Sequence, residues 1–151
     1  MKKKILVTGG AGFIGTRLCN TLIEDYDITV LDYFWFGDKL DSRINKLMGG
    51  IVDLKVEDLK GYDAVLFLAG LSNDPMAEFK PNLNFTENSA VPTYLAYLTK
   101  EAGIKKFIGA STCSVYGYTK NKKLFEDSKV TPTFPYGIAK LQFEKGVSIL
   151  Q

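Results

Sequence analysis

The stretch Thr8-Gly9-Gly10-Ala11-Gly12-Phe13-Ile14-Gly15 decides the fold of this chain. It follows Ile5-Leu6-Val7, an apolar run of the kind that forms a buried strand. The residues that come next, from about Phe13 to Glu24, have the apolar periodicity of an amphipathic helix. A strand, a glycine turn and a helix in this order predict a phosphate-binding turn that opens a βαβ unit.

Each of the three regularly spaced glycines has its own physical role in such a turn. Gly9 permits the tight turn, Gly12 lets a pyrophosphate approach the backbone, and Gly15 lets the helix pack closely on the strand. The helix N-terminus adds backbone N–H groups and positive potential for phosphate. We therefore expect a dinucleotide to bind at Gly9, Gly12, Phe13, Ile14 and Gly15.

A carboxylate stands where such a site needs one. Ile28-Thr29-Val30-Leu31 is predicted as the second strand, and it ends at Asp32. A carboxylate there can accept hydrogen bonds from the adenosine ribose and would repel a 2′-phosphate. The sequence therefore favours NAD as the cofactor over NADP, although an ordinary turn residue is the alternative interpretation of Asp32.

The rest of the chain continues to alternate strand-like and helix-like segments, which is typical of a parallel sheet. We expect a weak third strand at Ile51-Val52, a fourth at 64–68 and a fifth at 106–111; residues 33–50 carry no clear pattern. The expected fold is a Rossmann-type, doubly wound parallel α/β domain over residues 1–151, with strand order 3-2-1-4-5.

Two helices and two loops complete the prediction. Residues 71–81 are predicted as a loop, followed by a helix from about Asn84 to Ala102 that is capped by Gly103. Pro92 predicts either a kink in that helix or a later start. A polar loop at 118–133 then leads to a last helix, from about Pro135 to the chain end.

Composition excludes several classes of function. The net charge of the 151 residues is only +2, which argues against nucleic acid or a membrane surface as partner. No apolar stretch is long enough to span a bilayer, and a cytoplasmic location is expected. The sequence has no histidine, and its two cysteines, Cys19 and Cys113, lack metal-ligand spacing, so neither histidine catalysis nor a metal site is expected.

A possible acid–base pair lies at the start of the last helix. Tyr136 and Lys140 are four residues apart, so their side chains share one face of the helix. An ammonium close to a phenol lowers the pKa of the phenol, and this would make tyrosine a usable acid and base. Ser111-Thr112 at the end of the fifth strand adds hydroxyls to the same set, although a hydroxyl that only satisfies local backbone is the alternative for Thr112.

Taken in order, these motifs resemble those of the extended short-chain dehydrogenase/reductases, the NAD-dependent sugar-nucleotide epimerase/dehydratase family. The resemblance covers nearly the whole chain. It rests on residues 8–15, Asp32, Asp53-Leu54, Leu68-Ala69-Gly70, Asn88, residues 111–117 (Ser-Thr-Cys-Ser-Val-Tyr-Gly) and residues 135–140 (Pro-Tyr-Gly-Ile-Ala-Lys).

The resemblance implies a role for each matching residue. Asp53 and Leu54 would flank the adenine, and Leu68, Ala69 and Gly70 would line the cofactor. Thr112 would be the catalytic hydroxyl, and Tyr136 the acid and base. Lys140 would hold the nicotinamide ribose and tune Tyr136, while Asn88 would be mainly architectural. The implied chemistry is hydride transfer at a hydroxyl or ketone of a nucleotide sugar.

Two departures from the family pattern matter. Dehydratases carry an acidic pair directly after the catalytic hydroxyl, whereas this chain has Cys113 and Ser114, which favours the epimerase and reductase side. Family members are also about twice as long, so the resemblance implies that the sixth strand and the sugar-binding domain are absent from residues 1–151. A partner chain could supply that half, or two chains could pair through the helices at 84–102 and 135–151. A non-catalytic NAD(H)-binding module, or a protein used only for dimerisation, is the alternative function.

Overall fold

The computed structural model describes residues 1–120 and 123–150, which form two compact units. The first unit contains residues 1–69 and 94–110, and the second contains residues 70–93 and 111–151. The part of the predicted loop at 118–133 that falls on residues 121–122, and the last residue of the predicted final helix, lie outside the described residues.

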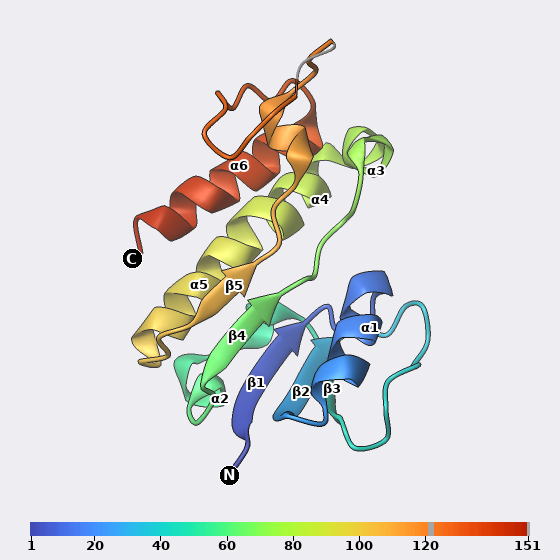
Figure 1. Ribbon diagram of the computed structural model, residues 1–151, viewed down its shortest axis with the longest axis vertical. Helices are drawn as coiled ribbons and strands as arrows, with labels where there is room; N and C mark the ends of the chain where they lie inside the picture. The colour runs from blue at the N-terminus through green and yellow to red at the C-terminus, as the bar shows by residue number, and fades with distance from the viewer. Residues whose placement is uncertain (121–122, 151) are drawn as a thin grey trace. The chain divides into compact units, whose positions relative to one another are not determined.

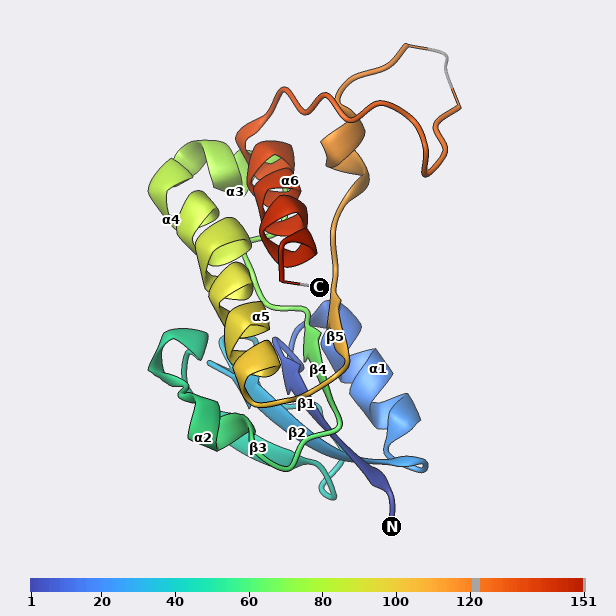
Figure 2. The same ribbon diagram turned by 90° about the vertical axis from the view of Figure 1, so that its left-hand side faces the viewer.

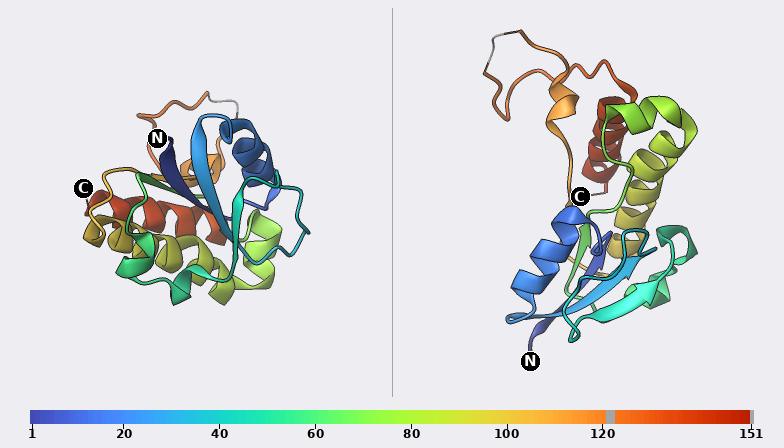
Figure 3. Two further views of the ribbon diagram at one scale, coloured as in Figure 1. Left: turned by 90° about the horizontal axis from the view of Figure 1, so that it is seen from below. Right: turned by 90° about the vertical axis from the view of Figure 1, so that its right-hand side faces the viewer.

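The first unit is built on a five-stranded parallel sheet in the order β3-β2-β1-β4-β5, as predicted (Figure 1). The strands are β1 (Lys3–Thr8), β2 (Tyr26–Asp32), β3 (Asn45–Met48), β4 (Ala64–Phe67) and β5 (Phe107–Gly109). Helix α1 (Phe13–Leu22) covers one face of the sheet, and α2 (Val56–Leu59) and α5 (Val91–Glu101) cover the other (Figure 2, Figure 3). The fold class is therefore confirmed.

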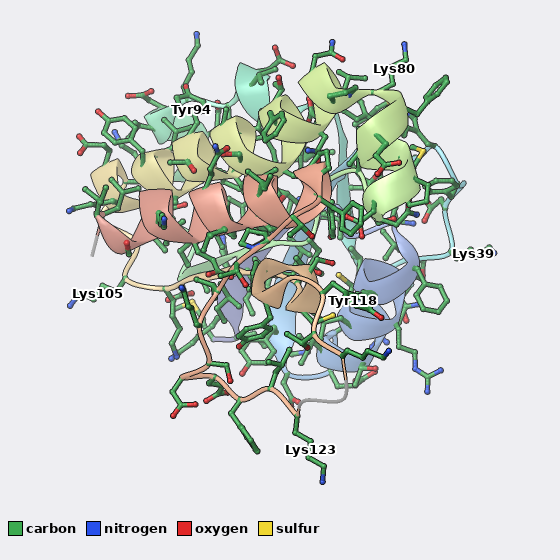
Figure 4. All side chains as sticks on the ribbon, turned by 90° about the horizontal axis from the view of Figure 1, so that it is seen from above. Lys39, Lys80, Tyr94, Lys105, Tyr118 and Lys123 are labelled. Carbon is green, nitrogen blue, oxygen red and sulfur yellow. The ribbon has the colours of Figure 1, made fainter. Side chains whose placement is uncertain are left out.

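The core of this unit lies between the central strands and α1. Val7 of β1 pairs with Val30 of β2 on one side and with Leu66 of β4 on the other, and all three side chains are buried. Burial of one such side chain contributes about 1.5–3 kcal/mol relative to leaving it in water. Long basic side chains such as Lys39 and Lys105 instead point outward from the ribbon (Figure 4).

The predicted third strand was wrong. The third strand is β3 at Asn45–Met48, and Ile51–Asp53 forms a short 3₁₀-helix, η1. Strand β3 pairs only with β2 and has mostly exposed side chains, so it lacks the apolar run by which a buried strand is recognised. The apolar character of Ile51 reflects the burial of its side chain in the turn that follows the strand.

The second unit is helical. It contains α3 (Asp74–Phe79), α4 (Pro81–Phe85), a π-helical turn η2 (Thr86–Ala90), a 3₁₀-helix η3 (Cys113–Tyr116) and α6 (Pro135–Ser148). Helix α6 packs against each of the other four elements. The predicted loop at 71–81 was therefore wrong for most of its length, since its Asn, Asp and Pro residues begin a helix: Asn73 Oδ1 accepts a hydrogen bond from the Met76 N–H, and Pro75 lies in the first turn.

The helix predicted from Asn84 to Ala102 begins earlier and is interrupted. Helical structure starts at Pro81, and η2 widens the helix just before Pro92, so that the Val91 N–H donates to the Thr86 carbonyl five residues back. A wider turn accommodates a residue that has no N–H of its own. The predicted end is confirmed, because Gly103 has φ +76° and lies directly after the last helical turn. Among the described residues, each helix is too short or too polar to cross a membrane.

Candidate functional site

The three glycines of the first turn are held by different neighbours. A Cβ at Gly9, which has φ +76°, would lie 2.4 Å from the Ala69 nitrogen, and one at Gly15 would lie 2.5 Å from the Gly9 carbonyl oxygen. Backbone atoms therefore exclude any side chain at these two positions. A Cβ at Gly12 would meet only the Gly9 oxygen, at 3.3 Å. This contact is tight but much less severe than those at Gly9 and Gly15, so the backbone alone constrains Gly12 less than the other two glycines.

Helix α1 begins at this turn with its N-terminal N–H groups pointing to the same place. Gly12 occupies the N-cap position, has no side chain to cap the helix, and is followed by a first turn without acidic residues. Phe13 and Ile14 are exposed, with 99% and 63% of their surface accessible. Uncapped N–H groups and the helix dipole make such a terminus a site for an anion such as a pyrophosphate.

Asp32 connects the glycine turn to the loop after β2. One carboxylate oxygen accepts from the Ala11 N–H at 2.9 Å and the other from the Phe34 N–H at 2.8 Å. The structure thus adds a local structural role to the ribose contact expected from the sequence. Each carboxylate oxygen has a second lone pair, so the two bonds leave acceptor capacity for ribose hydroxyls.

An aromatic pair beside Asp32 was missed by the sequence analysis. Phe34 has a left-handed φ of +55° and packs into the core, while the rings of Tyr33 and Trp35 stack at 5.6 Å and are largely exposed. A Cβ at Gly50 would lie 2.1 Å from the Tyr33 hydroxyl, so Tyr33 lies against the turn that precedes Asp53. Residues 33–50 show no periodicity, so the sequence held no signal that would have placed this pair.

The remaining cofactor residues of the first unit also follow the carboxyl ends of strands. Leu68 comes after β4, and its N–H donates to the Thr8 carbonyl at 2.9 Å; Ala69 lies against Gly9. Asp53 and Leu54 come after β3, in η1 and directly beyond it. Doubly wound sheets bind their ligands at this end of the sheet.

The expected acid–base residues lie in the second unit. Thr112 is the N-cap of η3: its hydroxyl accepts from the Ser114 N–H at 3.2 Å and lies 3.3 Å from the Ser114 hydroxyl. Lys140 is buried, with its ammonium 6.0 Å from the centre of the Tyr136 ring. The Ser111 hydroxyl donates to the Glu144 carboxylate, which connects the segment before Thr112 to α6. Glu144 was not singled out from the sequence, because a lone glutamate on a helix carries no signal.

The net shift of the Tyr136 pKa is opposite to the lowering expected from a nearby Lys140. Burial raises the pKa of Tyr136, and the nearby Asp74 and Cys113 raise it further. Burial also lowers the pKa of Lys140, to about 8. Loss of solvation disfavours both charged forms, and the acidic neighbours of Tyr136 add to that effect. Near neutral pH, Tyr136 therefore holds its proton.

Asn88 lies at the centre of a buried hydrogen-bond chain in the same unit. Its side-chain amide donates to the Leu71 carbonyl and to Asn84 Oδ1, both at 2.9 Å, and the Asn84 amide donates to the Pro135 carbonyl at 2.9 Å. Gly70 has φ +132°, and a Cβ there would lie 2.3 Å from Asn88 Oδ1. This arrangement supports the architectural role that the resemblance implies for Asn88.

A parallel sheet in this order, with a glycine turn after β1 and a carboxylate at the end of β2, defines a Rossmann-type dinucleotide-binding fold. Within that class, the chain belongs to the NAD-dependent epimerase/dehydratase family, whose profile matches residues 5–150.

Relatives of known name agree with the family. UDP-glucose 4-epimerase 3 of Oryza sativa is 33% identical over 93% of this chain and 42% of its own length. The human dTDP-D-glucose 4,6-dehydratase is also 33% identical, over 94% of this chain and 45% of its own length. The chain thus spans less than half the length of these relatives.

Solved structures agree on the fold. A UDP-N-acetylglucosamine 4-epimerase from Methanobrevibacter ruminantium, in complex with UDP-N-acetylmuramic acid, has a TM-score of 0.89 and 31% identity, covering 99% of this chain and 51% of that one. A UDP-glucuronic acid 4-epimerase from Bacillus cereus, in complex with NAD, has a TM-score of 0.82 and 32% identity, covering 97% of this chain and 52% of that one.

Proposed function

We propose that residues 1–151 are the NAD(H)-binding part of a sugar-nucleotide epimerase or reductase that acts at a sugar hydroxyl or ketone, in the manner of UDP-glucose 4-epimerase. The observation that carries the proposal is the uncapped N-terminus of α1, which begins at the glycine turn with no acidic residue in its first turn. A glycine at Gly12 would let a pyrophosphate approach these N–H groups without a side chain between them. Asp32, whose carboxylate retains acceptor capacity, would bind the adenosine ribose and favour NAD over NADP.

The other cofactor residues fit the same group. Phe13, Ile14 and Gly15 would supply the N–H groups of the first helical turn, and Asp53 and Leu54 would flank the adenine. Leu68, Ala69 and Gly70 would line the cofactor after β4. When bound, NAD supplies the acceptor and donor of the hydride. The chain's own residues bind it and move the proton.

The proton transfer would be the task of three residues in the second unit. Tyr136 holds a proton at its hydroxyl near neutral pH and can donate it to a sugar ketone oxygen; in the opposite direction it takes a proton from the sugar hydroxyl. Lys140, with a pKa of about 8, is mostly an ammonium at pH 7 and would favour the phenolate when it forms. Thr112 would orient the reacting hydroxyl once its own hydroxyl turns away from Ser114.

A calorimetric titration of the purified chain with NAD⁺ tests the cofactor part of the proposal. We expect Gly12→Val to lose most of the affinity, because a branched side chain would occupy the space for the phosphate. Thr21→Val is a suitable control, since it introduces the same side chain at an exposed position of the same helix. Equal affinity of the Gly12→Val variant and the unmodified chain would show that the turn does not bind the pyrophosphate.

A non-catalytic NAD(H)-binding module is the second candidate. The observation that favours it is the engagement of the Thr112 hydroxyl in a local cap, which satisfies that group without a substrate. The two candidates differ in turnover: a catalytic chain interconverts nucleotide sugars and loses this activity with Tyr136→Phe, whereas the module binds NAD⁺ only.

A further inference from the structure

The start of α3 holds a carboxylate that the proposed chemistry does not use. Asp74 is the first residue of the helix, between Asn73, whose side chain caps it, and Pro75 in its first turn. Asn73 has φ +83° and ψ 157°, a backbone conformation that residues other than glycine rarely adopt. The backbone on both sides of Asp74 is thus held in place, and the position of its carboxylate is set by the helix start.

This carboxylate lies beside Tyr136. Helix α3 packs against α6, and Tyr136 lies in the first turn of α6. After burial, Asp74 is the largest cause of the raised pKa of Tyr136. An anion has such an effect on a phenol only when the two groups are close together in a poorly solvated place.

One oxygen of Asp74 needs a hydrogen-bond donor. Asp74 Oδ1 is buried and has no hydrogen-bond partner among the described residues. An unpaired buried oxygen is costly and calls for an explanation such as a ligand. A metal ion does not supply it, because in the described part of the chain no three carboxylate or thiol groups lie close enough to hold one. A hydrogen-bond donor from outside the chain could satisfy this oxygen.

We propose that Asp74 is a specificity-determining residue: its buried oxygen accepts a hydrogen bond from a sugar hydroxyl next to the one that reacts at Tyr136. This inference rests on the proposed function, since it takes a nucleotide sugar as the ligand. It differs from the roles implied for Thr112, Tyr136 and Lys140, because Asp74 selects the sugar and does not itself exchange a proton with it. In dehydratases an acidic pair directly follows the catalytic hydroxyl, and this chain lacks that pair. The carboxylate near Tyr136 here is that of Asp74, from α3.

The first arm of the test asks whether Asp74 faces Tyr136, and it needs no ligand. Ionisation of Tyr136 is followed by ¹³C NMR of chains labelled at the tyrosine ζ-carbon, with the signal assigned by Tyr136→Phe. Asp74→Asn should lower the pKa of Tyr136, because it removes the negative charge at nearly constant size. Glu78→Gln is the matched control, since Glu78 is exposed on the same helix and the same charge is removed. An unchanged Tyr136 titration in Asp74→Asn would overturn the proposal.

The second arm measures binding of UDP-glucose, and of analogues that each lack one sugar hydroxyl, to the NAD⁺-saturated chain. We expect one analogue to bind the unmodified chain roughly tenfold more weakly than UDP-glucose, as for loss of a hydrogen bond to a charged group. In Asp74→Ala, which removes the acceptor, this difference should disappear. A difference that persists in Asp74→Ala would overturn the assignment.

The two arms separate failure of the inference from failure of the proposed function. If the unmodified chain binds NAD⁺ but no nucleotide sugar, the proposed substrate class and the ligand assigned to Asp74 are both wrong. Asp74 lies in the second unit, so a urea denaturation curve that matches that of the unmodified chain is the check that each Asp74 variant is folded.

Discussion

Three glycines at equal spacing look alike in the sequence, but their neighbours differ. A Cβ at Gly9 or Gly15 would lie within 2.5 Å of backbone atoms, whereas a Cβ at Gly12 would meet a single backbone oxygen at 3.3 Å, which a shift of a few tenths of an ångström would relieve. Gly9 and Gly15 are therefore needed for the folding of the turn. The role expected for Gly12 is in ligand binding.

This difference predicts opposite effects of two alanine substitutions. Gly15→Ala should lower the free energy of unfolding by about 1–3 kcal/mol, because its Cβ would overlap backbone atoms. Gly12→Ala should change it little. Urea denaturation of both variants checks the prediction, and equal stability of the two would contradict the structural distinction between them.

Asp32 combines a ligand role and a structural one, and substitution should separate them. Asp32→Ser should narrow the preference for NAD⁺ over NADP⁺, because it removes the charge that repels a 2′-phosphate. It should also destabilise the chain by about 1–3 kcal/mol, because the N–H groups of Ala11 and Phe34 lose their acceptors. Dissociation constants for both cofactors and a denaturation curve measure the two effects. An unchanged ratio of the two constants would mean that another residue recognises the ribose.

Burial of Lys140 predicts a pH dependence of stability. Its pKa is about 8 in the folded chain and 10.5 ordinarily, so above pH 8 the unfolded chain binds more protons than the folded one. The free energy of unfolding therefore rises with pH in that range. Below pH 8 the buried amine is charged, and it lowers the free energy of unfolding by its full amount. Compared with Lys140→Met, the unmodified chain should gain about 1 kcal/mol between pH 7 and 9.

The comparison with Lys140→Met is needed because other groups act in the opposite direction. Burial raises the pKa of Cys19 to about 11, which lowers stability above pH 9, the ordinary value for a thiol. Both chains share that effect, so it cancels in the difference. Parallel pH profiles of the two chains would show that the Lys140 amine is solvated.

At the scale of elements, the wrong predictions of a strand at Ile51-Val52 and of a loop at 71–81 have a common cause. Strand β3 and helix α3 are short and largely exposed, so neither has the apolar period that marks a buried element. Their structure depends on neighbours: β3 pairs with β2, and α3 packs against α6. The buried strands β1, β2 and β4 and the amphipathic helix α1 could be predicted because burial requires an apolar pattern.

The hydrogen bonds of Asn88, in the π-helical turn η2, predict that its substitution lowers stability. Asn88→Ala should lower the free energy of unfolding by about 1–3 kcal/mol, because the Leu71 carbonyl and Asn84 Oδ1 both lose a buried donor. Asn82→Ala is the control, since Asn82 is exposed one helical segment earlier. If urea denaturation gave the same stability for both variants, the Asn88 network would not hold the helices of this unit together.

At the scale of the whole molecule, most of the expected cofactor residues belong to one unit and the expected acid–base residues to the other. Residues 1–69 and 94–110 carry the glycine turn, Asp32 and Asp53, whereas Thr112, Tyr136 and Lys140 lie in the other unit. The chain corresponds to less than half the length of its named relatives in rice and human. Cofactor binding and turnover are therefore expected to be separable properties of residues 1–151.

We predict that residues 1–151 alone bind NAD⁺ but turn over nucleotide sugars slowly. Positioning of reacting groups can lower a barrier by roughly 7–11 kcal/mol, and by resemblance some of the contacts that position a bound sugar for hydride transfer lie outside these residues. The measurement is turnover of UDP-, GDP-, CDP- and dTDP-sugars with NAD⁺, with and without candidate partner chains. Turnover at a rate typical of the family, abolished by Tyr136→Phe, would show that this chain is sufficient as an enzyme.

The sequence by itself determined the strand order, the glycine turn and the positions of Asp32, Thr112, Tyr136 and Lys140, because these depend on local spacing and on the period of burial. Only the tertiary structure decided which glycine is open to a ligand, that Asp32 also holds the turn, and that Tyr136 keeps its proton beside Asp74. These properties depend on contacts between residues far apart in the chain, and on the loss of solvent that those contacts cause.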